Sequence, residues 1–140
     1  MIIFKMIRRF CLHVRANKLQ HTKGIWMPIL YHETQKEDTV LVQGWIKDQP
    51  DQPQSWHLWC ETASGERHDP QITLLEMEEV YYKLIYETPI EKPPEAQEDE
   101  EIMNLWELYE KDPQEFWKKQ DPSVRSFRSK IFSLIKKKKF

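Results

Sequence analysis

The stretch from Ser55 to Pro70 constrains the fold of this chain more than any other part of the sequence. Side chains of different character alternate along residues 55–62, as expected of a strand with one face in a core. One face holds Trp56, Leu58 and Cys60, and the other holds His57, Trp59 and Glu61. Residues 63–65, Ala-Ser-Gly, fit a three-residue loop, because glycine takes the left-handed third position at no steric cost. The stretch therefore predicts a β-hairpin.

The length of the loop sets the register of this hairpin. With three loop residues, Thr62 faces Glu66 and Trp59 faces Asp69. Asp69 then lies on the face of His57, one diagonal step away, at roughly 7–8 Å between backbones. A two-residue turn would shift the pairing by one residue and move Asp69 to the opposite face.

His57 and Asp69 form the one predicted pair in the chain that suggests catalysis. A carboxylate beside an imidazole fixes its tautomer and stabilises the imidazolium that forms when a thiol is deprotonated. The pair would be the orienting half of a Cys-His-Asp triad. The structural alternative is a half-buried histidine and a surface aspartate that ends a strand before Pro70.

Four short motifs extend the catalytic hypothesis: Val42-Gln43-Gly44-Trp45, His57-Leu58-Trp59, Ser64-Gly65-Glu66 and Asp69-Pro70. In this order they resemble uncharacterised phage and bacterial proteins related to the transglutaminase-like and papain-like cysteine enzymes, over about residues 38–86. Tyr81-Tyr82 also resembles an aromatic pair of those proteins. The resemblance implies a thiol-dependent acyltransferase or amide hydrolase with its catalytic residues in the order Cys, His, Asp.

The resemblance also implies a role for each site residue. Cys11 is the only cysteine before His57, so it would attack a carbonyl, with His57 as base and then acid and Asp69 orienting His57. In the resembling proteins the cysteine begins a helix and has more chain before it than the ten residues here. A degenerate member without catalysis is therefore the alternative.

The two cysteines, Cys11 and Cys60, are too few for a disulfide framework, which fits a reducing, cytoplasmic compartment. Cys60 shares the face of Trp56 and Leu58 and is expected to be a small core residue. Cys11 is either core packing or the nucleophile. No apolar run approaches the ~18 residues that a membrane-spanning helix needs.

No motif indicates a cofactor. The histidines are His13, His21, His32, His57 and His68. They are scattered, without a Cys-x-x-Cys or His-x-x-x-His pair, which argues against a zinc site. The chain also has neither a glycine-rich phosphate loop nor a Gly-x-Ser-x-Gly elbow. The expected complement of cofactors and metals is therefore none.

The 140 residues fit one domain with extensions. We expect an α+β domain over 1–88, a Pro-rich acidic linker over 89–100 and a helical C-terminal extension with a basic tail over 101–140. In the domain, an N-terminal helix over about 3–14 would cover a small antiparallel sheet of four to five strands. The strands are expected over 25–32, 39–47, the two arms of the hairpin and 80–87. Pro28 would mark an edge or bulge of the first strand.

Charge is distributed unevenly, although the formal net charge is only -2. Residues 1–32 carry six Lys or Arg and no acid, so organelle targeting is an alternative to a packed N-terminal helix. Residues 121–140 carry seven basic residues against Asp121 alone. The segment between them is acidic.

Three helices are expected in the extension. The first uses Ile102, Leu105, Trp106 and Tyr109. Asp112-Pro113 and Asp121-Pro122 each read as an N-cap with a first-turn proline, before helices over 114–119 and 123–138. The last helix has an apolar stripe of Val124, Phe127, Ile131, Leu134 and Ile135. This stripe would pack on the domain or a partner helix, or lie on an anionic membrane, while the basic residues of 123–140 would suit nucleic-acid phosphates.

Two classes of function follow. One is a thiol-dependent enzyme that acts on a protein or peptide substrate. The other is a non-catalytic interaction protein that keeps the sheet as a scaffold and binds a partner through its C-terminal helices. No motif sets an oligomeric state.

Overall fold

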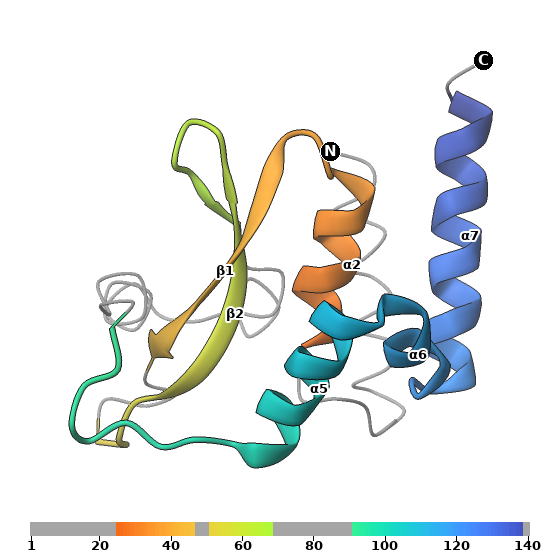
Figure 1. Cartoon of the computed structure of the whole chain (residues 1–140). Helices are drawn as coiled ribbons and strands as arrows, with labels where there is room; N and C mark the ends of the chain where they lie inside the picture. Colours follow the sequence, from red (N-terminus) through yellow and green to blue (C-terminus); the bar gives the residue numbers. More distant parts are fainter. Residues whose placement is uncertain (1–24, 47–50, 69–90, 139–140) are drawn as a thin grey trace.

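The computed structural model of the chain describes residues 25–46, 51–68 and 91–138. The elements in order are helix α2 (Trp26–Thr34), strands β1 (Thr39–Ile46), β2 (Ser55–Thr62) and β3 (Arg67–His68), and helices α5 (Glu100–Lys111), α6 (Pro113–Lys118) and α7 (Pro122–Lys138). The fold is α+β, as predicted. Helix α2 lies between the sheet and α7, and α5 and α6 cross below them in the view of Figure 1.

The sheet is built around β2. Strand β1 pairs with it antiparallel along the whole length, with Gly44 opposite His57. Strand β3 pairs with the other edge of β2, with Cys60 opposite His68. Gly65 closes the loop at φ 84°, a left-handed conformation that glycine adopts without a Cβ clash. The predicted three-residue loop and its register are therefore confirmed at Cys60 and His68.

The predicted count of four to five strands is not supported. The described residues contain three strands, and β3 is only two residues long. The expected strand over 25–32 is wrong, because those residues belong to helix α2 and its N-cap. The expected strand over 80–87 and the expected helix over 3–14 lie outside the described residues.

Helix α2 is almost entirely interior, which explains the misassignment. Its residues from Trp26 to Tyr31 are all buried, because the sheet and α7 cover it from different sides. A helix without a solvent face shows no amphipathic period, and its short apolar run then resembles a buried strand. Pro28 lies in the first turn, where its missing N–H removes no helical hydrogen bond.

The C-terminal helices confirm the predicted cap at Asp112 and the predicted first-turn prolines. The side chain of Asp112 accepts the backbone N–H of Glu115 at 3.2 Å, and Asp99, a cap that was not predicted, accepts that of Ile102 at 3.2 Å. Pro113 and Pro122 are the first residues of α6 and α7. An aspartate at the N-cap satisfies a free backbone donor, and proline in the first turn costs no hydrogen bond.

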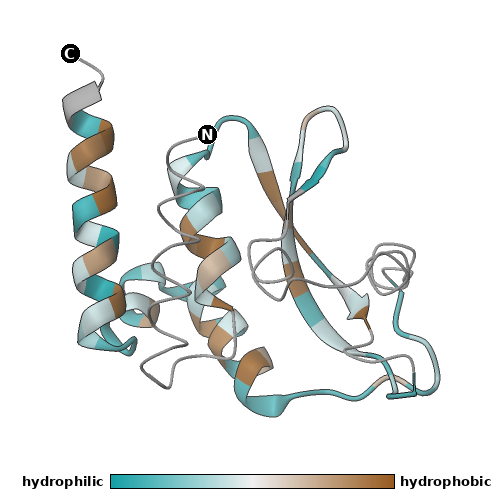
Figure 2. Cartoon of the chain, turned by 180° about the vertical axis from the view of Figure 1, so that it is seen from behind, coloured by the Kyte–Doolittle hydropathy of each residue, from teal (hydrophilic) through white to brown (hydrophobic). Residues whose placement is uncertain are grey.

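One hydrophobic core joins the sheet region to the C-terminal helices. Its buried residues include Leu30 of α2, Trp56 and Leu58 of β2, Phe116 of α6 and Ile131 of α7. Figure 2 shows hydrophobic residues on α2 and at intervals along α7, and a mostly hydrophilic segment before α5.

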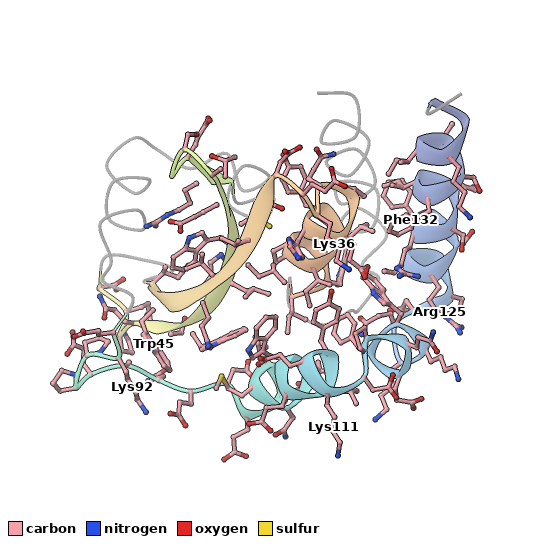
Figure 3. All side chains as sticks on the ribbon, turned by 45° about the horizontal axis from the view of Figure 1, so that its top comes forward. Lys36, Trp45, Lys92, Lys111, Arg125 and Phe132 are labelled. Atoms are coloured by element: carbon pink, nitrogen blue, oxygen red, sulfur yellow. The ribbon has the colours of Figure 1, made fainter. Side chains whose placement is uncertain are left out.

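The hydrophilic segment 91–99 contacts the sheet. The backbone N–H of Gln97 donates to the carbonyl of Gln54 at 2.6 Å, and Gln97 forms a parallel bridge with Ser55. The ammonium of Lys92 lies 5.4 Å from the ring centroid of Trp45, and Figure 3 shows the two side chains together. The predicted domain limits at 88 and 100 stay a prediction.

Candidate functional site

His57 lies in the middle of β2, on the face predicted for it. Its half-buried ring stacks on that of Trp59, with centroids 6.1 Å apart and planes at 25°. Trp59 is 1 % exposed, and the guanidinium of Arg67 lies 4.5 Å from its ring centroid. Face parity follows from the pleat of the strand, which puts residues two apart on one side. His57 therefore belongs to a row of aromatic and cationic side chains.

Gly44 makes room for this row. A Cβ atom built on Gly44 would lie 2.3 Å from Cη2 of the Trp59 ring, far inside van der Waals contact. The ring of Trp59 thus crosses the backbone of β1 at Gly44, the residue that pairs with His57. A glycine is required here by the close approach of the ring.

Cys60 faces away from His57. It is fully buried, and its Sγ donates to the carbonyl oxygen of Pro28 in α2 at 3.2 Å. The predicted role of Cys60 as a core residue is confirmed. Cys60 is the only cysteine in the described part of the chain, so none of the described thiols lies on the face of His57.

The other two predicted catalytic residues, Cys11 and Asp69, lie outside the described residues. The structure thus shows one member of the predicted triad, His57, and the hairpin register on which its pairing with Asp69 was predicted. The roles of Cys11, His57 and Asp69 stay predictions.

Arg67 is a neighbour of this face that was not among the predicted site residues. It pairs with Glu61, so it lies one diagonal step from Trp59 on the same face. The predicted register already implied this position. The loop length that aligns Cys60 with His68 also aligns Arg67 with Glu61, and so sets the face on which Arg67 lies.

A second cluster of polar residues holds the C-terminal helices to α2. One carboxylate oxygen of Glu33 accepts the indole N–H of Trp117 at 3.2 Å, and the other accepts Nε of Arg128 at 3.2 Å. The Arg128 guanidinium also lies 4.7 Å from the Trp117 ring centroid. Burial, with a smaller contribution from Glu33, raises the pKa of Tyr109 to about 12. Glu33 thus connects α2 with α5, α6 and α7.

Helix α7 turns two different faces to its surroundings. Val124 and Ile131 are buried in the core, and Phe127 and Ile135 are half-buried against it. The opposite side, here called the outer face of α7, consists of the exposed residues Arg125, Ser126, Ser129, Lys130, Ser133, Leu134 and Lys136. Helix α7 contains no acidic residue.

The apolar stripe of α7 is largely engaged. An amphipathic helix binds a membrane through a free apolar face, whereas this stripe packs on the core, apart from Leu134 at 41 % exposure. The predicted membrane contact would therefore require α7 to leave the core. Within residues 25–46, 51–68 and 91–138, no helix combines the length and apolar character that crossing a membrane requires.

The described residues also contain no group of three or more His, Cys, Asp or Glu that could hold a metal ion. No family model, no curated protein and no solved structure matches the chain.

Proposed function

We propose that this chain is a non-catalytic interaction protein that binds its partner through the outer face of α7. The observation that carries the proposal is the division of α7 into a buried apolar side and an exposed cationic side. Core packing and the contact of Arg128 with Glu33 fix the helix against α2. Such a helix holds its exposed residues at fixed positions on the surface, which lowers the entropic cost of binding.

The charge of this surface specifies the kind of partner. Arg128 is paired with Glu33, whereas Arg125, Lys130 and Lys136 lie on the outer face. Because no acidic residue of α7 offsets them, the outer face attracts anionic groups. Ser126 and Ser129 add hydrogen-bond donors on the same side.

The cysteine positions support the non-catalytic part of the proposal. In the proteins that the sequence resembles, the nucleophilic cysteine begins a helix. The described helix packed on both long strands, α2, has Ile25 at its N-cap and Trp26 at its first position, and contains no cysteine. Cys60 is buried on the α2 side of β2. In the described part of the chain, neither α2 nor β2 therefore offers a thiol to His57, which supports a scaffold without catalysis.

The experiment compares partners recovered by the full chain and by point variants from an extract of cells that make it. Lys130→Glu with Lys136→Glu should lose the partner, whereas Cys11→Ala should retain it. Lys36→Glu with Lys118→Glu is the matched control, because both lysines are exposed and lie outside α7. Equal recovery by the α7 variant, or a loss in Cys11→Ala, would contradict the proposal.

Point variants are preferable to truncation after Glu100. Truncation would remove Phe116, Trp117, Val124 and Ile131, all of which are buried in the core. Loss of binding would then report unfolding as well as loss of the surface.

A second candidate is acyl transfer or amide hydrolysis by Cys11, His57 and Asp69. The hairpin register at Cys60 and His68 favours it, because the His57–Asp69 pair was predicted on that register. The test is the alkylation of native protein at neutral pH. Fast, selective labelling of Cys11 that slows in His57→Gln would support an activated thiol. Slow labelling of Cys11 that is unchanged in His57→Gln would exclude it.

A further inference from the structure

Two neighbouring parts of the chain carry opposite charge. Residues 91–111 contain eight acidic and two basic side chains, a net charge of -6. Helix α7 contains six basic side chains and no acidic one, a net charge of +6. Only α6 and two short connections separate them. The whole chain has a formal net charge of -2, so the molecule is strongly bipolar while being nearly neutral.

The acidic region is displayed on the surface. Glu100, Glu101, Glu107 and Glu110 of α5 are all exposed. The ion pair of Lys92 with Glu98 forms within the acidic region, and the pair of Arg128 with Glu33 joins α7 to α2. Neither pair brings the outer face of α7 to the acids of α5.

An open groove runs along α5 toward α6, with a volume of about 560 Å³. Leu105 and Leu108 are its half-buried apolar residues, and Glu101 and Glu107 are exposed acids that line it. Lys111 and Lys119 line the end nearest α6, and Figure 3 shows Lys111 extending away from the body of the molecule. The acidic part of the groove is therefore the part farther from α6.

The outer face of α7 matches this groove in chemistry. Leu134 is one of two large hydrophobic residues exposed in the described part of the chain. Lys130 is four residues before it and thus its neighbour on the helix surface. An exposed leucine beside Lys130 complements the part of the groove where Leu105 adjoins Glu101, because apolar contact and opposite charge coincide there.

We propose that the protein self-associates, with the outer face of α7 from one copy docked in the α5 groove of a second copy. The proposal rests on the proposed function, since it names the partner of the same surface. Leu134 would contact Leu105 and Leu108, with Lys130, its neighbour on the helix, toward Glu101 and Glu107. Lys136 lies farther round the outer face and adds positive charge at the edge of the contact. A second copy is favoured over nucleic acid or an anionic membrane, because either of these would be repelled by the acidic region of each bound copy.

Salt dependence follows from the nature of the contact. Exposed ion pairs are weak and are screened once the Debye length falls to a few ångströms. Sedimentation velocity of the full chain should therefore show association at low salt that weakens about tenfold or more when salt is raised to molar levels. A chain that stays monomeric at low salt and high protein concentration would overturn the proposal.

Charge reversal locates the contact. Lys130→Glu with Lys136→Glu should abolish self-association, and so should Glu101→Lys with Glu107→Lys. An equimolar mixture of the two double variants should restore a complex that contains both, because each supplies the surface that the other has lost. A mixture that stays monomeric contradicts the proposed pairing. Lys36→Glu and Glu37→Lys are matched controls on the exposed turn before β1 and should associate like the original chain.

Sedimentation velocity also tests nucleic acid and anionic membranes as alternative partners of the outer face of α7. A short DNA duplex and vesicles that contain an anionic phospholipid are added to the original chain and to the Lys130/Lys136 variant. Binding of either probe that depends on Lys130 and Lys136, by a chain that is itself monomeric, would overturn self-association and leave the proposed function standing. Self-association that survives both charge reversals would assign the contact to another surface and also overturn the proposal.

Discussion

Helices α2 and α7 lie side by side (Figure 1), but they differ in how much of each is enclosed. In α2, all residues from Trp26 to Tyr31 are buried. In α7, Val124 and Ile131 are fully enclosed, and the outer face is exposed. The sheet covers α2 on the side away from α7, whereas α7 is at the edge of the molecule. The buried residues of an interior helix therefore contribute to stability, while the exposed face of an edge helix remains accessible to a partner.

The largest difference in stability between the two helices is expected when one leucine in each is replaced by alanine. Leu30→Ala in α2 should lower the free energy of unfolding by about 2–5 kcal/mol, because it leaves a cavity in a fully buried site. Leu134→Ala in α7 should change it by less than about 0.5 kcal/mol, because the side chain is 41 % exposed. Urea unfolding of both variants measures the difference, and similar losses would remove the distinction between the two helices.

The next effect concerns the contact that joins the two helices. Glu33→Ala should destabilise the protein by about 1–3 kcal/mol, because it leaves the indole N–H of Trp117 and the guanidinium of Arg128 without their acceptor. Glu37→Ala, on the exposed turn after α2, is the control and should be close to neutral. Thermal unfolding is the measurement. Equal melting temperatures for the two variants would show that Glu33 does not hold α7 to α2.

Tyr109 gives a pH-dependent test of the same junction. Burial holds its pKa at about 12 in the folded chain, above the ordinary value of 10.0. Folding thus favours the neutral phenol. The contribution of Tyr109 to the free energy of unfolding is therefore complete below pH 10.0 and is lost as the pH rises toward about 12. Tyr109→Phe should flatten the alkaline decline in stability. If stability declines at alkaline pH as steeply in Tyr109→Phe as in the original chain, ionisation of Tyr109 is not the cause of the decline.

The smallest effect is expected at the end of α2. Burial lowers the pKa of His32 below 6.5, and its Nδ1 lies 3.1 Å from Oγ1 of Thr39. The unfolded chain binds the proton of His32 more readily than the folded chain does. The contribution of neutral His32 to the free energy of unfolding is therefore present above pH 6.5 and is lost as the pH falls through the lower pKa of the folded chain. Urea unfolding of His32→Gln across this range should show a weaker acid dependence. An acid dependence identical to that of the original chain would contradict it.

Features encoded over a few neighbouring residues could be predicted. Gly65 fixed the hairpin loop, and Asp112 with Pro113 fixed the start of α6, because each depends on backbone geometry that few residue types satisfy. The burial of Cys60 followed from face parity with Trp56 and Leu58. At the candidate site, the sequence placed His57 on the face of Trp59 for the same reason.

Features that depend on distant contacts could not be predicted. Glu33 and Arg128 are 95 residues apart, and nothing near either residue indicates the other. The ring of Trp59 over Gly44 likewise depends on how β1 and β2 pair. Such contacts require the relative placement of whole elements, which local propensity does not fix.

The sequence by itself determined the local elements: a hairpin turned by Gly65, helices begun by Asp-Pro pairs, and a chain divided into acidic and basic regions. Only the tertiary structure decided that residues 26–34 are helical, because burial on several sides erases the periodicity by which a helix is recognised. It also decided which side of α7 is free. The apolar side is enclosed by the core, so the charges of the outer face are left for a partner.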